Sequence, residues 1–481
     1  MFEKKNKNDA PLYELTQSQD AIMFMLAFSR HKQVTQIPTS LALGADIDFD
    51  KLEEAVNIEI KRNDCLRIRL KKAGVTLAGG KIPVPKYKQY FLPEYEVRGI
   101  KRLKFDTDEQ KDAFFGKDAG TPIEVTKDEV FRIYFFTDKD GKNGLYFNVS
   151  HLIMDAYGVC VFYFDLLGVY LSLVRGTDLP KPLKPFEEVI KDELAYLNDK
   201  EAYEADRKFY EQDLKEGGEP YYTGVHGHEM LDRQRIKEHN PDLHVPDAYT
   251  MDHDEAEMLY CKIPADVSRK LLVFCQANNI APEAVLEQGF RTYASVRNFR
   301  QKDIYSMLIC NRRTKIKTKY TGGCMMVPFM FRTIISEDKT FMEALDIINA
   351  VRIKLYQHMN FPYATARAMS MSYFRYRPTQ APAFMMFSWI PVPPLPDGLD
   401  IKFDFKFYNM GYYVLPLYMV AMPNYTDGTI DIAYLYRPSY ITEENLRDFN
   451  DKAVKVIEQG LDDPGITVGE LLDSIDEEEY H

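Results

Sequence analysis

Two histidines in this 481-residue chain are each followed four positions later by an aspartate. The pairs are His151 with Asp155 and His228 with Asp232. A histidine of ordinary pKa, about 6.5, can take a proton from a hydroxyl or amine at neutral pH and return it to a leaving group. The chemistry would be general-base catalysis. In a chain with nine histidines the spacing should occur by chance about once, so the surrounding elements must decide between the copies.

The elements around His151 favour the first copy. Residues 145–150 alternate between apolar and polar side chains, which predicts a half-buried strand. Residues 159–174 carry apolar side chains at helical spacing, and Gly176 follows as a stop signal. We therefore expect His151 in a turn between a strand and a helix, with Asp155 at the helix N-cap.

The second copy, at His228, lies in a polar stretch for which we predict a loop. Histidines crowd this region together with several carboxylates, which raises the question of a metal site. Their spacing matches no zinc signature, so we expect no metal. The histidines concerned are His226, His228, His239, His244 and His253.

Composition excludes several classes of function. The net charge of -12 argues against nucleic acid or an anionic membrane surface as a partner. Residues 1–9 show no secretory leader, and the longest apolar run, 412–421, is too short for a membrane helix, so we expect no transmembrane segment. The six cysteines are widely spaced without a CxxC pair, which indicates reduced, mostly buried thiols in a cytoplasmic protein.

Helix and strand patterns alternate in both halves of the chain, which predicts two α/β sandwich lobes of helices on mixed sheets. We expect an N-terminal lobe at 1–180, a crossover region at 181–257 and a C-terminal lobe at 258–481. The expected elements include helices from Asp50, near Glu201–Leu214, from Pro282, from Phe341 and from Glu443, strands at 67–70, 259–263 and within 383–436, strands and loops over 71–143, and turns at Gly79-Gly80 and Asp140-Gly141.

Six stretches carry a further likeness in their order along the chain. They are Leu15–Gln19, Phe49–Leu52 with Arg62–Arg69, Ser150–Asp155, Glu201–Leu214, Asn311–Arg313 with Thr321–Pro328, and Asp427–Tyr436. Together they resemble the chloramphenicol acetyltransferase-like superfamily, and within it non-ribosomal-peptide condensation domains and standalone alcohol acyltransferases. The likeness spans nearly the whole chain, and Ser150–Asp155 falls where the family has its HHxxxDG motif.

This resemblance implies two similar lobes arranged in a V, with His151 at the middle of a tunnel between them. It implies acyl transfer from a thioester to a hydroxyl or amine, with no metal, no bound cofactor and no covalent acyl-enzyme. The acyl donor would be an acyl-CoA or a phosphopantetheine-linked acyl group. The expected partners are a small-molecule acceptor and an acyl or peptidyl carrier protein.

The resemblance also assigns roles to single residues. Asp155 would be ion-paired to an arginine that supports the active site, with Arg312 as the first candidate and Arg67 and Arg313 behind it. A plain N-cap role for Asp155 is the alternative. The chain departs from the family at Ser150, where the motif has its first histidine.

Other departures and candidates follow from the same comparison. Ala156 stands where the motif has glycine, and residues 407–411 are the nearest match to the family's DFGWG segment. Ser388 could donate a hydrogen bond to a developing oxyanion or lie in the tunnel lining, although an ordinary strand serine is the alternative. Tyr157 and residues 384–387 could line the tunnel, or simply pack in the core.

The leading hypothesis is an acyltransferase with His151 as general base. A non-catalytic, condensation-domain-like binding or recruitment module is the alternative, motivated by Ser150 and Ala156. An epimerase-like member, which would also use the motif histidine, is a third. The acyl length, the acceptor, the oligomeric state and the choice between CoA and a carrier stay open.

Overall fold

The computed structural model describes residues 10–78, 82–127, 129–225, 227–248, 253–392 and 404–476. The chain divides into two compact units that are not contiguous in sequence. Unit 1 comprises 1–203, 311–327 and 392–411, and unit 2 comprises 204–310, 328–391 and 412–481. The predicted lobes at 1–180 and 258–481 are contiguous, whereas two later segments of the chain belong to the first unit. The predicted turn at Gly79-Gly80 lies outside the described residues.

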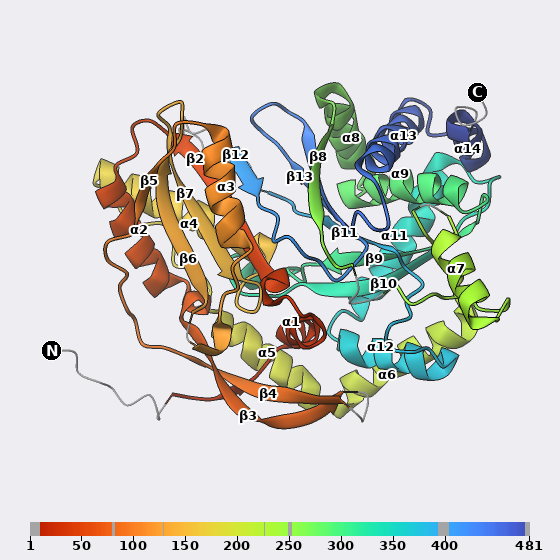
Figure 1. Ribbon diagram of the computed structural model, residues 1–481, viewed down its shortest axis with the longest axis horizontal. Coiled ribbons are helices and arrows are strands. Elements are labelled where there is room, and N and C mark those ends of the chain that lie inside the picture. Colours follow the sequence, from red (N-terminus) through yellow and green to blue (C-terminus); the bar gives the residue numbers. More distant parts are fainter. Residues whose placement is uncertain are drawn as a thin grey trace. The chain divides into compact units, whose positions relative to one another are not determined.

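Unit 1 is built on a five-stranded sheet in the order β12-β2-β7-β6-β5 (Figure 1). Neighbouring strands are antiparallel except β5 and β6, which run parallel. The strands are β2 (Gln36–Gly44), β5 (Arg102–Lys104), β6 (Phe131–Thr137), β7 (Asn143–Ser150) and β12 (Asp404–Phe407). The predicted Asp140-Gly141 turn joins β6 to β7, with Gly141 at φ +76°. Residues 407–411, compared above with the DFGWG segment, begin at the last residue of β12, which is an edge strand of this sheet.

Both faces of this sheet are covered. Helices α2 (Phe49–Arg62) and α4 (Ala156–Arg175) pack against one face in a single apolar core. On the opposite face α3 (Asp108–Ala119) contributes Phe115, which stacks on Tyr146 of β7 at 4.3 Å between ring centroids. The prediction of a half-buried strand at 145–150 is therefore wrong, because α3 buries the face that carries the polar side chains. Helix α3 itself was not expected within 71–143.

Helix α4 confirms the predicted strand–turn–helix order. It begins after Asp155, whose side chain accepts a hydrogen bond from the backbone N–H of Gly158. It ends at Gly176 in the left-handed conformation, at φ +66°. At 20 residues α4 is the one described helix long and apolar enough to cross a membrane, so α4, in which Asp165 interrupts the apolar run, is a longer candidate than the predicted 412–421. Because 61% of its most apolar window is buried, α4 fits a core helix.

A second sheet in unit 1 has three strands in the order β1-β4-β3. Strands β3 and β4 form a long antiparallel hairpin, and β3 is an edge strand. These strands are β1 (Tyr13–Glu14), β3 (Ile68–Ala78) and β4 (Ile82–Phe91). The remaining elements of unit 1 are the helices α1 (Gln17–Phe28), α5 (Phe186–Asn198) and α10 (Ile316–Lys319) and the 3-10 turns η1 (Lys32–Thr35), η2 (Asp64–Arg67) and η3 (Val125–Lys127). Helix α6 (Lys200–Gly217) begins in unit 1 and lies mostly in unit 2.

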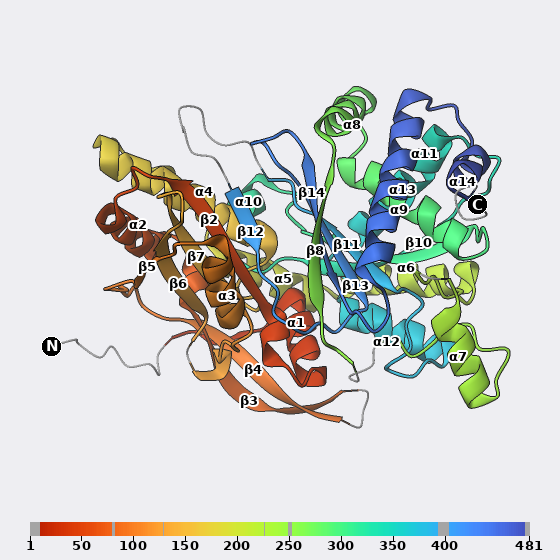
Figure 2. The same cartoon turned by 45° about the horizontal axis from the view of Figure 1, so that its top comes forward.

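Unit 2 carries a six-stranded mixed sheet in the order β10-β9-β11-β13-β14-β8. Its strands are β8 (Glu257–Ile263), β9 (Asp303–Cys310), β10 (Val327–Ile334), β11 (Met385–Trp389), β13 (Leu417–Pro423) and β14 (Ile430–Tyr436). Helix α9 packs beside α13, as Figure 2 shows. The helices are α7 (Glu229–Glu238), α8 (Ala265–Asn278), α9 (Pro282–Arg297), α11 (Phe341–Gln357), α12 (Tyr363–Phe374), α13 (Glu443–Asp462) and α14 (Val468–Asp476). Pro282 occupies the first turn of α9, as predicted.

Candidate active site

The turn that carries His151 is held by short backbone hydrogen bonds within unit 1. The N–H of His151 donates to the carbonyl of Thr35 at 2.8 Å, and the N–H of Ile153 donates to the carbonyl of Ser150 at 3.1 Å. The Ser150 hydroxyl accepts from the N–H of Leu152 at 3.3 Å. Ser150 therefore braces the turn, at the position where the resembling family has its first histidine.

The imidazole of His151 is neutral at physiological pH. Burial lowers its pKa below the usual value of 6.5, while the charge of Asp155 and an interaction of the ring with its own backbone raise it in part. The residue still keeps part of its surface accessible. Its Nδ1 lies 3.7 Å from the Sγ of Cys324. A neutral imidazole is the form that a general base requires.

Asp155 uses its two carboxylate oxygens for different partners. Oδ1 accepts from the backbone N–H of Gly158 at 2.7 Å and so caps α4. Oδ2 accepts from a terminal nitrogen of Arg313 at 2.7 Å and from the backbone N–H of Met325 at 2.7 Å. The two alternatives considered for Asp155, N-cap and ion-pair partner, therefore hold at the same time.

The arginine on Asp155 is Arg313, so the prediction of Arg312 as its partner is wrong. The Asp155–Arg313 pair is almost fully buried, with side-chain exposures of 2% and 1%. Arg312 instead pairs with Glu193 on α5 at 2.7 Å. Arg67, the other candidate, donates to backbone carbonyls. The two consecutive arginines diverge because Arg312 adopts a left-handed conformation, at φ +53°.

Tyr157 lies next to this ion pair. The Arg313 guanidinium sits over its ring at 4.8 Å from the centroid, a cation–π contact. Arg313 also donates to the carbonyl of Gly323 at 2.7 Å. Tyr157 therefore packs on the group that fixes the His151 turn, and its predicted role in lining a tunnel stays a prediction.

The replacement of the motif glycine by Ala156 is accommodated, because Ala156 is the first residue of α4. The residue that must be glycine is Gly158. A Cβ added there would lie 2.1 Å from the carbonyl oxygen of Gly322 and 2.8 Å from the Cγ of Met154. The close approach of α4 to the segment at 321–325 thus depends on Gly158.

Ser388 lies on β11 of unit 2 and is 5% exposed. The neighbouring residues 384–387 are also buried, and Phe387 contacts Phe290 of α9 with ring centroids 5.1 Å apart. These contacts show core packing for Phe387. A role for Ser388 as oxyanion donor or tunnel lining stays a prediction.

The second HxxxD copy does not form a comparable site. His228 precedes the first residue of α7, so the loop predicted at 228–232 is wrong. Only Leu231 of this helix is buried, which is why the apolar pattern gave no helical signal. The ring of His228 contacts Gln301 at 3.3 Å. Among the described residues there is no cluster of three or more His, Cys, Asp or Glu that could hold a metal, and His226 lies outside them.

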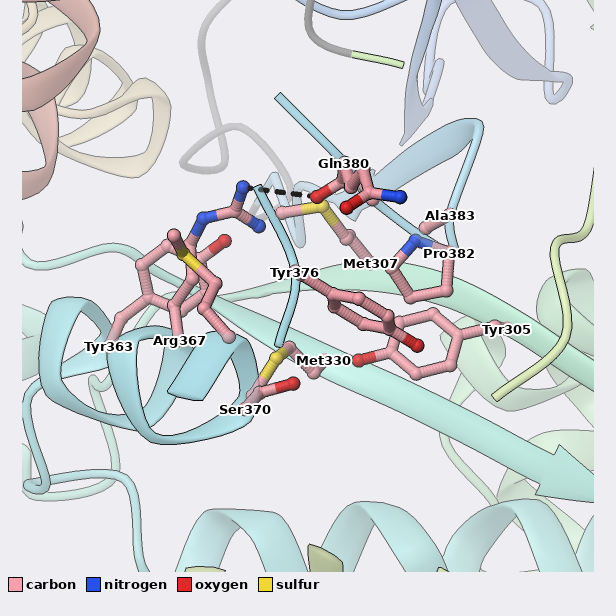
Figure 3. A pocket seen from close by; sticks show the side chains of 12 residues that line it. Tyr305, Met307, Met330, Tyr363, Arg367, Ser370, Tyr376, Gln380, Pro382 and Ala383 are labelled. Carbon is pink, nitrogen blue, oxygen red and sulfur yellow. Dashed lines mark hydrogen bonds between the residues drawn. The ribbon is translucent and has the colours of Figure 1, made fainter. Parts of the chain in front are cut away.

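Two hollows lie within unit 2. One, of about 20 Å³, is lined by Tyr305 and Tyr376 among others, and beside it Arg367 donates to the carbonyl of Gln380 at 3.5 Å (Figure 3). This is roughly room for one water molecule, so no substrate fits. The other, of about 320 Å³, lies beside α7, and the charged groups Glu229 and Arg233 on its wall are paired with each other. Neither hollow is lined by His151 or its partners.

Two residues of the site were missed in the sequence. Cys324 was interpreted only as a buried thiol, and a contact between residues 173 positions apart leaves no local signal. Glu193 did have a signal. It continues the apolar face of α5 formed by Phe186, Val189 and Ile190, and a carboxylate on such a face requires a partner.

Solved structures with the same fold define the class of protein. The first condensation domain of the calcium-dependent antibiotic synthetase, in complex with substrate analogue 3a, matches with a TM-score of 0.75 at 14% identity over 96% of this chain and 99% of that chain. A mutant starter condensation domain of rhizomide synthetase RzmA in complex with C8-CoA matches with a TM-score of 0.70 at 14% identity, over 95% and 96%. The fold is therefore the two-lobed, chloramphenicol acetyltransferase-like fold of mixed helices and open sheets, as predicted.

The family itself follows from the sequence. The profile of the family described as "Condensation domain" matches residues 10–371, and the chain belongs to this family. Acyl transfer is the general reaction of condensation domains. Surfactin synthase subunit 1 of Bacillus subtilis (strain 168) is 21% identical over 95% of this chain, and gramicidin S synthase 2 of Brevibacillus brevis is 26% identical over 40% of it. The chain spans only 12% and 4% of the lengths of these relatives.

Proposed function

We propose that this chain moves an acyl group from a pantetheine-linked thioester to a hydroxyl or amine acceptor, with His151 as the general base. The observation that carries the proposal is a neutral imidazole in a strand-to-helix turn that a buried ion pair holds in place. The crystallised complex of a starter condensation domain with C8-CoA supports a CoA thioester as one donor. A carrier-bound acyl group is the other donor of the same chemistry.

The hydrogen on the imidazole decides whether the ring can act as a base. General-base catalysis requires the tautomer in which Nδ1 carries the hydrogen and Nε2 offers its lone pair. Nε2 takes the acceptor's proton as the acceptor attacks the thioester carbonyl carbon. Collapse of the oxyanion breaks the C–S bond, and the leaving thiolate receives the proton.

The second candidate is a non-catalytic binding or recruitment module, and one contact favours it. Burial raises the pKa of the Cys324 thiol well above its usual value, so this thiol keeps its hydrogen. If it donated that hydrogen to Nδ1 across the 3.7 Å contact, Nε2 would carry the other hydrogen and could not act as a base. The module would then keep the fold of the family without its chemistry.

Thiol release from a panel of acyl-CoAs and acylated carrier proteins, with alcohol and amine acceptors, tests the two candidates. General-base catalysis predicts that His151→Ala lowers kcat by about 10²–10⁴-fold. His228→Ala is the matched control, because it removes the other HxxxD histidine and should leave turnover unchanged. Full turnover in His151→Ala would contradict the assignment of the base. No turnover with any donor would favour the recruitment module.

A further inference from the structure

The three-stranded sheet of unit 1 concentrates positive charge on a chain whose net charge is -12. Strand β3 carries Lys71 and Lys72, and β4 carries Lys86 and Lys88. Lys71 stands directly opposite Lys88 in the antiparallel register. Like charges in this position destabilise a sheet, so the arrangement has a cost that folding alone does not explain.

Carboxylates compensate only part of this charge. Glu14 on β1 pairs with Lys86 at 3.2 Å and with Lys88 at 2.7 Å. Asp20 interacts electrostatically with Lys86. Over the described part of the chain, neither Lys71 nor Lys72 forms an ion pair. The excess positive charge therefore lies on β3.

A buried cation at the base of the same strand adds to the positive potential. Arg69 precedes Lys71 by two residues, so both lie on one face of β3. It is 6% exposed and donates to the backbone carbonyls of Leu66 and Ile68, at 3.2 and 2.7 Å. Its Nε has no partner among the described atoms, and no described carboxylate pairs with it.

The hairpin of β3 and β4 also packs against residues next to His151. Leu70 of β3 and Tyr87 of β4 belong to one apolar cluster with Leu152 and Cys324. Lys72 stands opposite Tyr87 and two residues beyond Leu70, about 7 Å along the strand on the same face. Strand β3 is an edge strand, so one of its sides has no neighbouring strand. Lys71 and Lys72 are consecutive, so their side chains point to opposite faces of the sheet beside this free edge.

We propose that this edge binds the phosphate of the pantetheine-linked acyl donor, with Lys72 on the face that carries Leu70 and with Lys71 and Lys88 supplying positive charge from the opposite face. The inference rests on the proposed function and adds the place where the donor is anchored. Lysine binds phosphate as a point charge. CoA and a phosphopantetheinylated carrier share this chemistry, so both are sources of the same ligand group.

The double variant Lys71→Gln/Lys72→Gln tests the anchor through donors with and without phosphate. The expected result is a KM for acyl-CoA or the acylated carrier that rises about tenfold, with kcat unchanged. The KM for an acyl-N-acetylcysteamine thioester, which has no phosphate, should not change. Lys104→Gln/Lys117→Gln is the matched control, because it removes the same charge from exposed positions of unit 1 outside this sheet.

Direct binding separates this proposal from the proposed function. Titration of the wild-type chain with CoA, holo-carrier and apo-carrier needs no turnover, and the β3 variant should lose about tenfold in affinity for whichever phosphate ligand binds. Loss confined to CoA or to holo-carrier identifies the source, and either supports the anchor. If the β3 variant loses this affinity while the wild-type chain turns over no donor, only the proposed function is overturned.

Four results would overturn the anchor itself. The wild-type chain could bind neither CoA nor holo-carrier, or the β3 variant could behave like the control. The variant could raise the KM of the phosphate-free donor equally. It could also change only aggregation, which would show that the lysines serve to protect a free sheet edge.

Discussion

The ion pair between Asp155 and Arg313 supports a quantitative prediction. Both side chains are almost fully buried, so removing one charge leaves the other uncompensated in the interior. Breaking such a pair typically costs about 3–5 kcal/mol. We expect this loss in the free energy of unfolding for Asp155→Asn, which keeps an oxygen for the α4 cap, and for Arg313→Met.

The double variant should cost less than the sum of the single variants, because it removes both charges. We expect a coupling energy of about 2 kcal/mol or more, measured by urea unfolding followed by far-UV circular dichroism. Arg312→Met provides the matched cycle, since Arg312 pairs with Glu193. With Asp155→Asn it should be additive within about 0.5 kcal/mol. Coupling near zero for Arg313, or of the larger size for Arg312, would refute the assignment.

Three further predictions concern the same region. Because burial lowers the pKa of His151, the apparent pKa on the acid side of the kcat/KM profile should lie below 6.5, and an apparent pKa above 6.5 would contradict this. The unfolded chain binds this proton more tightly than the folded chain, so the contribution of His151 to the free energy of unfolding is lost as the pH falls below 6.5. Gly158→Ala should lower the free energy of unfolding by about 1–3 kcal/mol in a urea titration, because its Cβ would meet the carbonyl of Gly322; unchanged stability would show that the contact relaxes. Buried thiols with raised pKa values should resist a disulfide reagent at pH 8 until urea unfolds the chain, and fast labelling of the native protein would speak against their burial. These thiols are Cys65, Cys160 and Cys324.

Features with a local cause could be predicted from the sequence. The change from alternating to helical periodicity located the His151 turn, and Asp155 has the residue type of an N-cap. Pro282 marked the start of α9 for the same kind of reason. Helix α3 also had a local signal that was not used. Thr107 accepts from the N–H of Gln110, a capping pattern readable in the sequence.

Features that depend on distant contacts could not be predicted. Which of Arg312 and Arg313 pairs with Asp155 depends on the left-handed backbone conformation of Arg312. The sequence of two adjacent arginines does not indicate which side chain points towards Asp155. The burial of the polar face of β7 depends on α3, whose Asp118 accepts from the side chains of Tyr146 and Asn148. Polar side chains that pair in the interior have the same sequence pattern as polar side chains in water.

The partner of Asp155 has a consequence for the order in which the protein is made. Arg313 follows Asp155 by 158 residues, and most of the intervening chain belongs to the other unit. At a synthesis rate of about 5–20 residues per second, about 8–30 s pass between the synthesis of Asp155 and that of Arg313, and the carboxylate has no counter-ion during this time. During that time the start of α4 and the His151 turn lack the group that holds them. A nascent chain stalled before residue 311 should therefore expose this turn to proteases, and the site should form only when the ribosome has passed it.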